Sequence, residues 1–129
     1  MAPIAVSLDR AEPNVGVVSL IGEHDTYSAR RLENELGMLL DSAAHVVVDL
    51  TDATFVDSQT LSVLLTAQKT ADLKSLGFVL VVSRDDYTQV HRILDMTRLA
   101  SAFVMRPTLE EALSAARSGA AVPQRIEVA

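Results

Sequence analysis

Short apolar runs alternate along the chain with longer segments in which apolar residues recur every three or four positions. Residues 45–50 and 79–82 are dominated by valine and leucine, which is typical of central strands that are covered on both faces. Residues 4–8 alternate apolar with small or polar residues, and residues 14–21 are rich in β-formers. Turn-forming residues separate these two segments, which predicts an antiparallel pair of strands. A weaker apolar run at residues 102–105 predicts one more strand.

Four segments show the pattern of amphipathic helices. In residues 27–42, the leucines at positions 32, 36, 39 and 40 share one face of a helix. Similar patterns predict helices over residues 58–76, 86–96 and 108–117. The last helix opens with the spacing of a capping box, in which two side chains satisfy backbone amides. The resulting order, β-β-α-β-α-β-α-β-α, predicts an α/β fold with a mixed sheet and helices packed on it.

The length and composition fit one folded domain. The chain has 129 residues, of which 49% are hydrophobic, and it shows no internal repeat or linker before the last residues. Gly119 and Pro123 fall in a final segment without a helical pattern, which predicts a flexible tail over residues 119–129. We therefore expect a single domain over residues 1–118, followed by that tail.

The charge balance and the lack of cysteine exclude several classes of protein. Eleven Lys and Arg against 17 Asp and Glu give a net charge of −6, which argues against a nucleic-acid-binding protein. Without cysteine there is no disulfide, thiol nucleophile or cysteine-ligated zinc site. No apolar run approaches the roughly 18–20 residues that span a bilayer, and the first ten residues lack the features of a signal peptide. We expect a cytoplasmic protein that does not insert into membranes.

The sequence offers no convincing catalytic or cofactor site. The five glycines are isolated, so no phosphate-binding glycine loop can be assembled, and the surroundings of Ser58 do not match the nucleophile motif G-x-S-x-G. His24, His45 and His91 are scattered, and each is expected at the surface or at a strand edge. His24 and Asp25 together supply only two of the ligands that a metal site needs. We predict a protein without enzymatic activity, metal or cofactor.

One segment combines a buried strand, a short loop and the start of a helix. The strand is predicted to end near Leu50, and Asp57 and Ser58 begin the next helix. Ligands and partners of parallel sheets usually meet the loops beyond the carboxyl ends of the strands. The local pattern alone favours Ser58 as a simple helix cap; the alternative is a regulatory phosphoacceptor. A phosphate here would add about −1.5 to −2 charges at the positive end of a helix, and it would block a docked partner while the fold survived.

Three stretches of the chain are similar to the motifs of one protein family. Residues 20–25 (LIGEHD) are similar to L-x-G-E-x-D at the end of that family's second strand. Residues 47–51 (VVDLT) and 55–58 (FVDS) are similar to V-x-D-L-S and F-x-D-S-S-G, and residues 90–99 (VHRILDMTRL) to a helix that ends in T-G-L. The family is that of STAS domains, and the chain most resembles the free-standing anti-sigma factor antagonists of bacteria over residues 4–117.

The resemblance implies a STAS-like fold and a protein-binding function. When unphosphorylated, such a protein captures an anti-sigma factor that is also a serine kinase, which frees a sigma factor. The kinase phosphorylates the serine after the motif aspartate, and a metal-dependent serine phosphatase reverses this. The resemblance assigns phosphorylation to Ser58 and makes Asp57 a residue that shapes or caps its loop. The partner-binding residues that it implies are Gly22, Glu23, Asp25, Asp57, Ser58, Gln59 and Thr60.

Three positions depart from the family's pattern. Gln59 replaces its second serine, Thr60 its motif glycine, and Arg98 the glycine of T-G-L. Because a β-branched residue lacks the backbone freedom of glycine, we expect the helix start to be held differently. Thr60 or Ser62 then becomes an alternative phosphoacceptor. The departures leave two alternative functions open. The protein could be a STAS subunit of a stressosome-like or lipid-transport assembly that docks without phosphorylation, or a small enzyme or nucleotide-binding protein.

Overall fold

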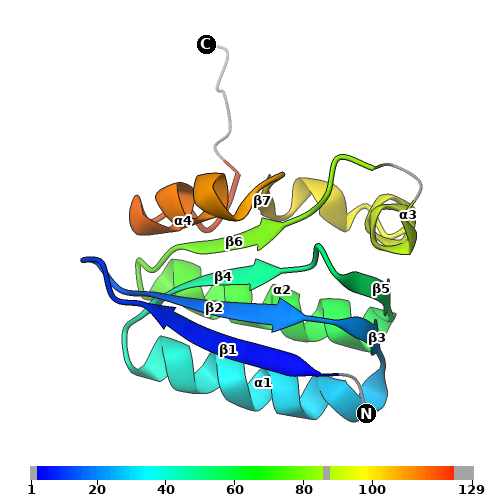
Figure 1. The fold of residues 1–129 in the computed structure, drawn as a ribbon, viewed down its shortest axis with the longest axis horizontal. Helices are drawn as coiled ribbons and strands as arrows, with labels where there is room; N and C mark the ends of the chain where they lie inside the picture. Colours follow the sequence, from blue (N-terminus) through cyan, green and yellow to red (C-terminus); the bar gives the residue numbers. More distant parts are fainter. Residues whose placement is uncertain (1–2, 86–87, 124–129) are drawn as a thin grey trace.

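Five strands form the main sheet of the computed structural model, which describes residues 3–85 and 88–123 (Figure 1). Strand β1 pairs antiparallel with β2, and the remaining neighbours β2, β4, β6 and β7 pair in parallel. The order across the sheet is β1-β2-β4-β6-β7. The strands are β1 (Ile4–Asp9), β2 (Val15–Leu20), β4 (His45–Asp49), β6 (Phe78–Val81) and β7 (Val104–Arg106). The predicted mixed sheet is thus confirmed.

The helices cover the two faces of this sheet unequally. Helices α1 (Thr26–Asp41) and α2 (Ser58–Leu73) lie on one face, and the shorter α4 (Leu109–Arg117) lies on the other (Figure 1). Each face has its own apolar cluster: Val46 and Val48 belong to the larger one, and Val47 to the one under α4. Successive strand residues point to opposite faces, which is why β4 is apolar at every one of these positions. Helix α3 (Gln89–Met96) and a 3-10 turn (Leu99–Ser101) complete the chain order.

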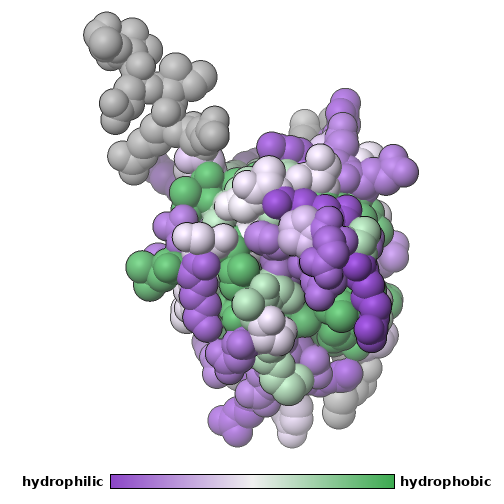
Figure 2. All heavy atoms as spheres, turned by 90° about the vertical axis from the view of Figure 1, so that its left-hand side faces the viewer, coloured by the Kyte–Doolittle hydropathy of each residue, from purple (hydrophilic) through white to green (hydrophobic). Residues whose placement is uncertain are grey.

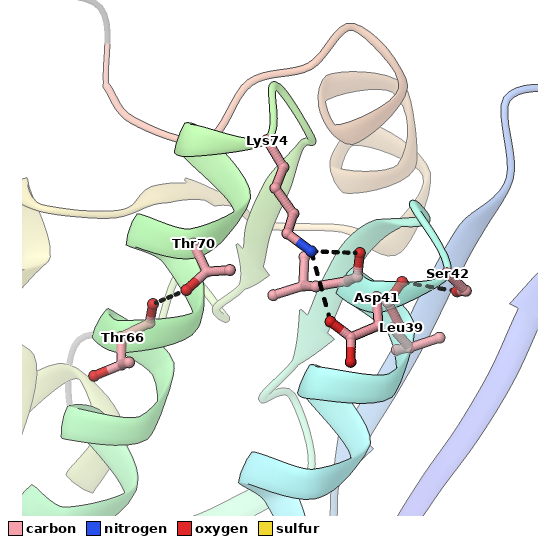
Figure 3. Close-up of polar contacts among 7 residues, drawn as sticks. Leu39, Asp41, Ser42, Thr66, Thr70 and Lys74 are labelled. Atoms are coloured by element: carbon pink, nitrogen blue, oxygen red, sulfur yellow. Dashed lines mark hydrogen bonds and ion pairs between the residues drawn. The ribbon is translucent and has the colours of Figure 1, made fainter.

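Helices α1 and α2 pack side by side and are tied at their C-terminal ends (Figure 3). The Lys74 ammonium group donates to the carbonyl of Leu40 at 3.4 Å and lies 3.6 Å from the carboxylate of Asp41. This ion pair is exposed, so it contributes under about 1 kcal/mol. The buried leucines and alanines between the helices therefore account for most of their association.

Gly77 lets β6 begin directly beneath α4. A Cβ atom at this position would lie 2.1 Å from the carbonyl oxygen of Ala116, far inside van der Waals contact. The carbonyl of Gly77 accepts a hydrogen bond from the amide of Val46, and the amide of Gly77 donates to Nδ1 of His45 at 2.8 Å. Only a residue without a side chain allows both this pairing and the close approach of the helix.

Two short strands were not expected from the sequence. Residues 22–24 and 53–56 form short strands, β3 (Gly22–His24) and β5 (Ala53–Val56), which pair in parallel as a separate two-stranded sheet. The segment before Ser58 was expected to be a plain loop. Residues 86 and 87, at the predicted start of the third helix, lie outside the described residues.

The first residues of the predicted tail, 119–121, contact the folded domain. The carbonyl of Ala120 accepts from the amide of Phe78 at 2.8 Å, and Ala121 is buried in the main core. The carbonyl of Ala121 also accepts from the side chain of Gln68 at 3.0 Å. The chain after α4 therefore packs along β6 and the end of α2, and residues 124–129 of the predicted tail lie outside the described residues.

The two ends of the sheet present different surfaces. Figure 2 looks at the end where the parallel strands begin, and there hydrophobic residues lie in separate groups among hydrophilic ones. The opposite end carries the loops that follow the carboxyl ends of the strands, together with β3, β5 and the starts of α1 and α2 (Figure 1). No helix in the described parts of the chain is long and apolar enough to cross a bilayer.

Candidate functional site

The start of α2 is built on a carboxylate. Asp57 is the N-cap residue, and its Oδ1 accepts from the backbone amide of Thr60 at 2.8 Å. Ser58 is therefore the first residue of the helix rather than its cap, and its side chain is exposed. The expectation that Asp57 caps this segment is confirmed. Ser58 is left at the surface beside this cap.

Thr60 supports the cap from the inside of the molecule. Its side chain is fully buried, and its hydroxyl lies 2.9 Å from Oδ1 of Asp57 and 3.3 Å from the carbonyl oxygen of His24. The helix start is thus held by a side chain that the family's glycine does not have. Thr60, expected as an alternative phosphoacceptor and partner contact, is therefore buried in this fold, whereas its neighbours Ser58 and Gln59 are exposed. Ser62 is exposed and stays a possible acceptor.

Strands β3 and β5 bring the first two motif stretches together. His24 is paired with Val56 across the small parallel sheet, and the amide of Asp57 donates to the carbonyl of His24 at 3.1 Å. Asp25 and Asp57, the residues that follow this pair, cap α1 and α2 respectively. Two helix N-termini therefore lie next to each other at one end of the molecule (Figure 1). Because each N-terminus carries about half a positive charge, the arrangement suits carboxylates and a phosphate.

Gly22 allows the chain to pass from the main sheet to the small one. Its φ angle is +80°, in the left-handed region that favours glycine. Its amide donates to the carbonyl of Asp52 at 2.9 Å, so the turn after β2 is joined to the turn after β4. This explains, in local physical terms, why a glycine precedes Glu23 and Asp25 in the first motif stretch.

His24 is a buried residue of this junction, not the surface or strand-edge histidine that was expected. Its Nε2 donates to the carbonyl of Ile21 at 3.1 Å, and its Nδ1 lies 3.1 Å from the hydroxyl of Ser28 in the first turn of α1. Burial lowers the pKa of His24 below its ordinary value. The neutral ring thus fixes β3 against α1. The described residues contain no cluster of three His, Cys, Asp or Glu that would hold a metal ion.

Gln89, the first residue of α3, is a site residue that the sequence analysis missed. Its side-chain oxygen accepts from the amide of Val56 at 2.8 Å, and its side-chain nitrogen donates to the carbonyl of Val56 at 2.9 Å. The amide group therefore pairs with β5 as a further strand would, directly before Asp57 and Ser58. A single glutamine after Thr88, the helix cap, carries no sequence signal for a contact 33 residues away.

A pocket of about 550 Å³ lies beside the start of α1. Its lining includes three of the predicted partner-binding residues, Gly22, Glu23 and Asp25, so the structure brings these together. Tyr27 is 89% exposed at its edge, and the pocket is completed by Pro3, Ile21 and Ser28. Asp57, Ser58 and Gln59 are not among its lining residues and form the adjoining start of α2. The surface is thus acidic, with an aromatic and an aliphatic side chain exposed.

Comparisons with known proteins agree with this architecture. The family model described as STAS domain matches residues 9–112. The crystal structure of an anti-sigma factor antagonist from Mycobacterium paratuberculosis is similar, with 28% identity and a TM-score of 0.71; the match covers 89% of this chain and 95% of that one. A structure from Thermotoga maritima has the same TM-score of 0.71 at 22% identity and covers 91% and 95% of the two chains.

Two structures of the anti-sigma factor antagonist SpoIIAA also share the fold. Its unphosphorylated form matches with a TM-score of 0.63 and 14% identity over 85% of this chain and 94% of that one. The phosphorylated form from Bacillus matches with a TM-score of 0.61 and 17% identity over 85% and 97%. At these identities the likeness establishes the fold alone.

Proposed function

Because this chain belongs to the STAS domain family, we propose that it is an anti-sigma factor antagonist that acts by binding another protein. The partner is an anti-sigma factor with serine kinase activity, in the cytoplasm. Binding requires unphosphorylated Ser58, phosphorylation by the partner releases it, and a metal-dependent serine phosphatase resets the switch. The chain itself has a binding role and no catalytic one.

One observation carries this proposal: Ser58 is exposed at the first position of a helix whose cap is made by its neighbour Asp57. Since the cap does not use the Ser58 hydroxyl, phosphorylation leaves the helix start intact. The positive end of the α2 dipole would stabilise the negative charge of the phosphate. The change is therefore expected at the surface, as negative charge added beside Glu23, Asp25 and Asp57.

The departure from the family motif at Thr60 supports this proposal over the alternative function, a STAS subunit that docks without being phosphorylated. Thr60 takes a structural place, holding the Asp57 carboxylate and the β3 backbone from within. The motif therefore keeps an exposed serine after a capping aspartate, even though its glycine is gone. The relatives with determined structures include a protein known in both phosphorylated and unphosphorylated forms.

Capture experiments with Ser58 variants test the proposal. Ser58→Ala should retain an anti-sigma factor kinase from extracts of the native host, and Ser58→Asp should lose it while its circular dichroism spectrum and unfolding midpoint stay those of the wild type. Ser114→Asp is the matched control, because Ser114 is exposed on α4 across the sheet. Equal capture by Ser58→Asp and Ser114→Asp would refute the switch. Recovery of transporter subunits alone would favour the docking subunit.

A further inference from the structure

A second hollow, of about 330 Å³, lies at the carboxyl ends of β6 and β7. Arg84 follows β6 by three residues, and Arg106 is the last residue of β7. The two strand ends are joined, since Arg106 is in register with Val81 and its carbonyl accepts from the amide of Val82 at 3.0 Å. Loops beyond the carboxyl ends of parallel strands are where such sheets usually bind ligands.

The charges around this hollow run against those of the whole protein. The chain carries a net charge of −6, yet two arginines and a histidine line the hollow and none of its described lining residues is acidic. Asp85, next in sequence to Arg84, is exposed and is not among the lining residues. A guanidinium group presents five donors in a planar fork that matches a phosphate. Arg106 uses one of them on the carbonyl of Met105 at 2.9 Å, which leaves four.

His91 and an apolar floor complete the walls. The Nε2 atom of His91 hydrogen-bonds to the carbonyl of Ser83; because a carbonyl oxygen only accepts, this nitrogen is the donor. The contact fixes the ring between α3 and the loop after β6. Val82, Met105 and Pro107 supply the apolar part of the lining. A ligand that fits both parts has a phosphate for the arginines and an organic body for the floor.

We propose that this hollow binds a phosphate ester, with Arg84 and Arg106 holding the phosphate and Met105 and Pro107 contacting the organic part. The site is separate from Ser58: α3 turns Gln89 toward β5, while His91 lines the hollow. The inference therefore does not depend on the proposed function.

Thermal unfolding with phenyl phosphate, the simplest ester with an apolar body, tests the site. A ligand that binds only the folded state stabilises it by RT ln(1 + [L]/Kd), so the unfolding temperature rises with ligand concentration and with affinity. Phenyl phosphate should raise it more than inorganic phosphate at equal concentration and ionic strength. Arg84→Gln/Arg106→Gln should weaken binding at least tenfold, whereas Arg10→Gln/Arg30→Gln, which removes the same charge from exposed positions elsewhere, and Ser58→Ala should not.

Three results would overturn the proposal. The first is that the wild type shows no shift with either anion. The second is that the two double variants lose binding equally, because that would mark a response to net charge. The third is that amide chemical shifts in the wild type change around Asp25 and Ser58 instead of around Ser83, His91 and Arg106.

Discussion

The side-chain amide of Gln89 holds both backbone hydrogen-bonding groups of Val56, at 2.8 Å and 2.9 Å. A side chain from α3 thus takes the place of a neighbouring strand at the outer edge of β5. Val56 is followed by the Asp57 cap and by Ser58, so this contact fixes the backbone from which the candidate phosphoacceptor is presented. It connects the first residue of α3 to the backbone directly before the start of α2.

Replacing Gln89 should loosen this junction. Gln89→Leu leaves the amide and carbonyl of Val56 without these partners, which should lower the free energy of unfolding by about 1–3 kcal/mol. Gln89→Glu keeps an acceptor for the amide and loses the donor to the carbonyl, so an intermediate loss is expected. Urea unfolding measures the free energy of unfolding of both variants. Gln59→Leu, at an exposed position, is the control and should have nearly the stability of the wild type. Wild-type stability for Gln89→Leu would show that the contact does not hold β5.

Returning Thr60 to the glycine of the family motif should destabilise this protein. Thr60→Gly removes the hydroxyl from Asp57 and from the His24 carbonyl and adds the cost of glycine in a helix, up to about 1 kcal/mol. Thr60→Val removes the hydroxyl alone and should cost about 0.5–1.5 kcal/mol, while Thr60→Ser should stay near the wild type. Chemical denaturation of the three variants gives the order. A Thr60→Gly protein as stable as the wild type would mean that the cap is held without residue 60.

Stability should fall as the solution becomes mildly acidic. Burial lowers the pKa of both His24 and His45 below 6.5, and the Nδ1 atom of His45 accepts from the amide of Gly77. The unfolded chain therefore takes up protons near pH 6.5, before the folded protein does. The free energy of unfolding should be steady above about pH 7.5 and fall below it, by up to about 1.4 kcal/mol per pH unit for each histidine.

Urea unfolding between pH 8 and pH 5 measures this slope, and NMR titration of the imidazole rings assigns it. His45→Gln should remove the part that is due to His45 and keep the part that is due to His24. Titration of either ring above pH 6.5 in the folded protein would contradict the prediction, because that histidine would then stabilise the fold on protonation.

Much of the fold could be predicted because its elements carry strong local patterns. The valine-rich runs of β4 and β6 and the leucine stripe of α1 follow directly from burial on two faces or on one. Strands β3 and β5 were missed because three or four residues with no apolar alternation become strands only through pairing with each other. The local pattern favoured Ser58 as a helix cap, and its assignment as the candidate phosphoacceptor came from the resemblance of residues 55–58 to the family motif.

The parts of the site that sequence could not give depend on distant contacts. Gln89 meets Val56 across 33 residues, and Thr60 meets the carbonyl of His24 across 36. The burial of Thr60 follows from the packing of the start of α2 on β3, which no local pattern encodes. Similarly, the sequence around Ala121 reads as a tail because its contacts, such as the bond from Gln68 to its carbonyl, are with residues about 50 positions away.

The most direct test of the account is the affinity of the captured anti-sigma factor for two preparations of this protein, unphosphorylated and stoichiometrically phosphorylated at Ser58, measured by isothermal titration calorimetry. Intact mass and circular dichroism should show one added phosphate and an unchanged fold. The account predicts tight binding for the unphosphorylated protein and at least a hundredfold weaker binding, about 2.7 kcal/mol, for the phosphorylated one. Equal affinities would contradict it.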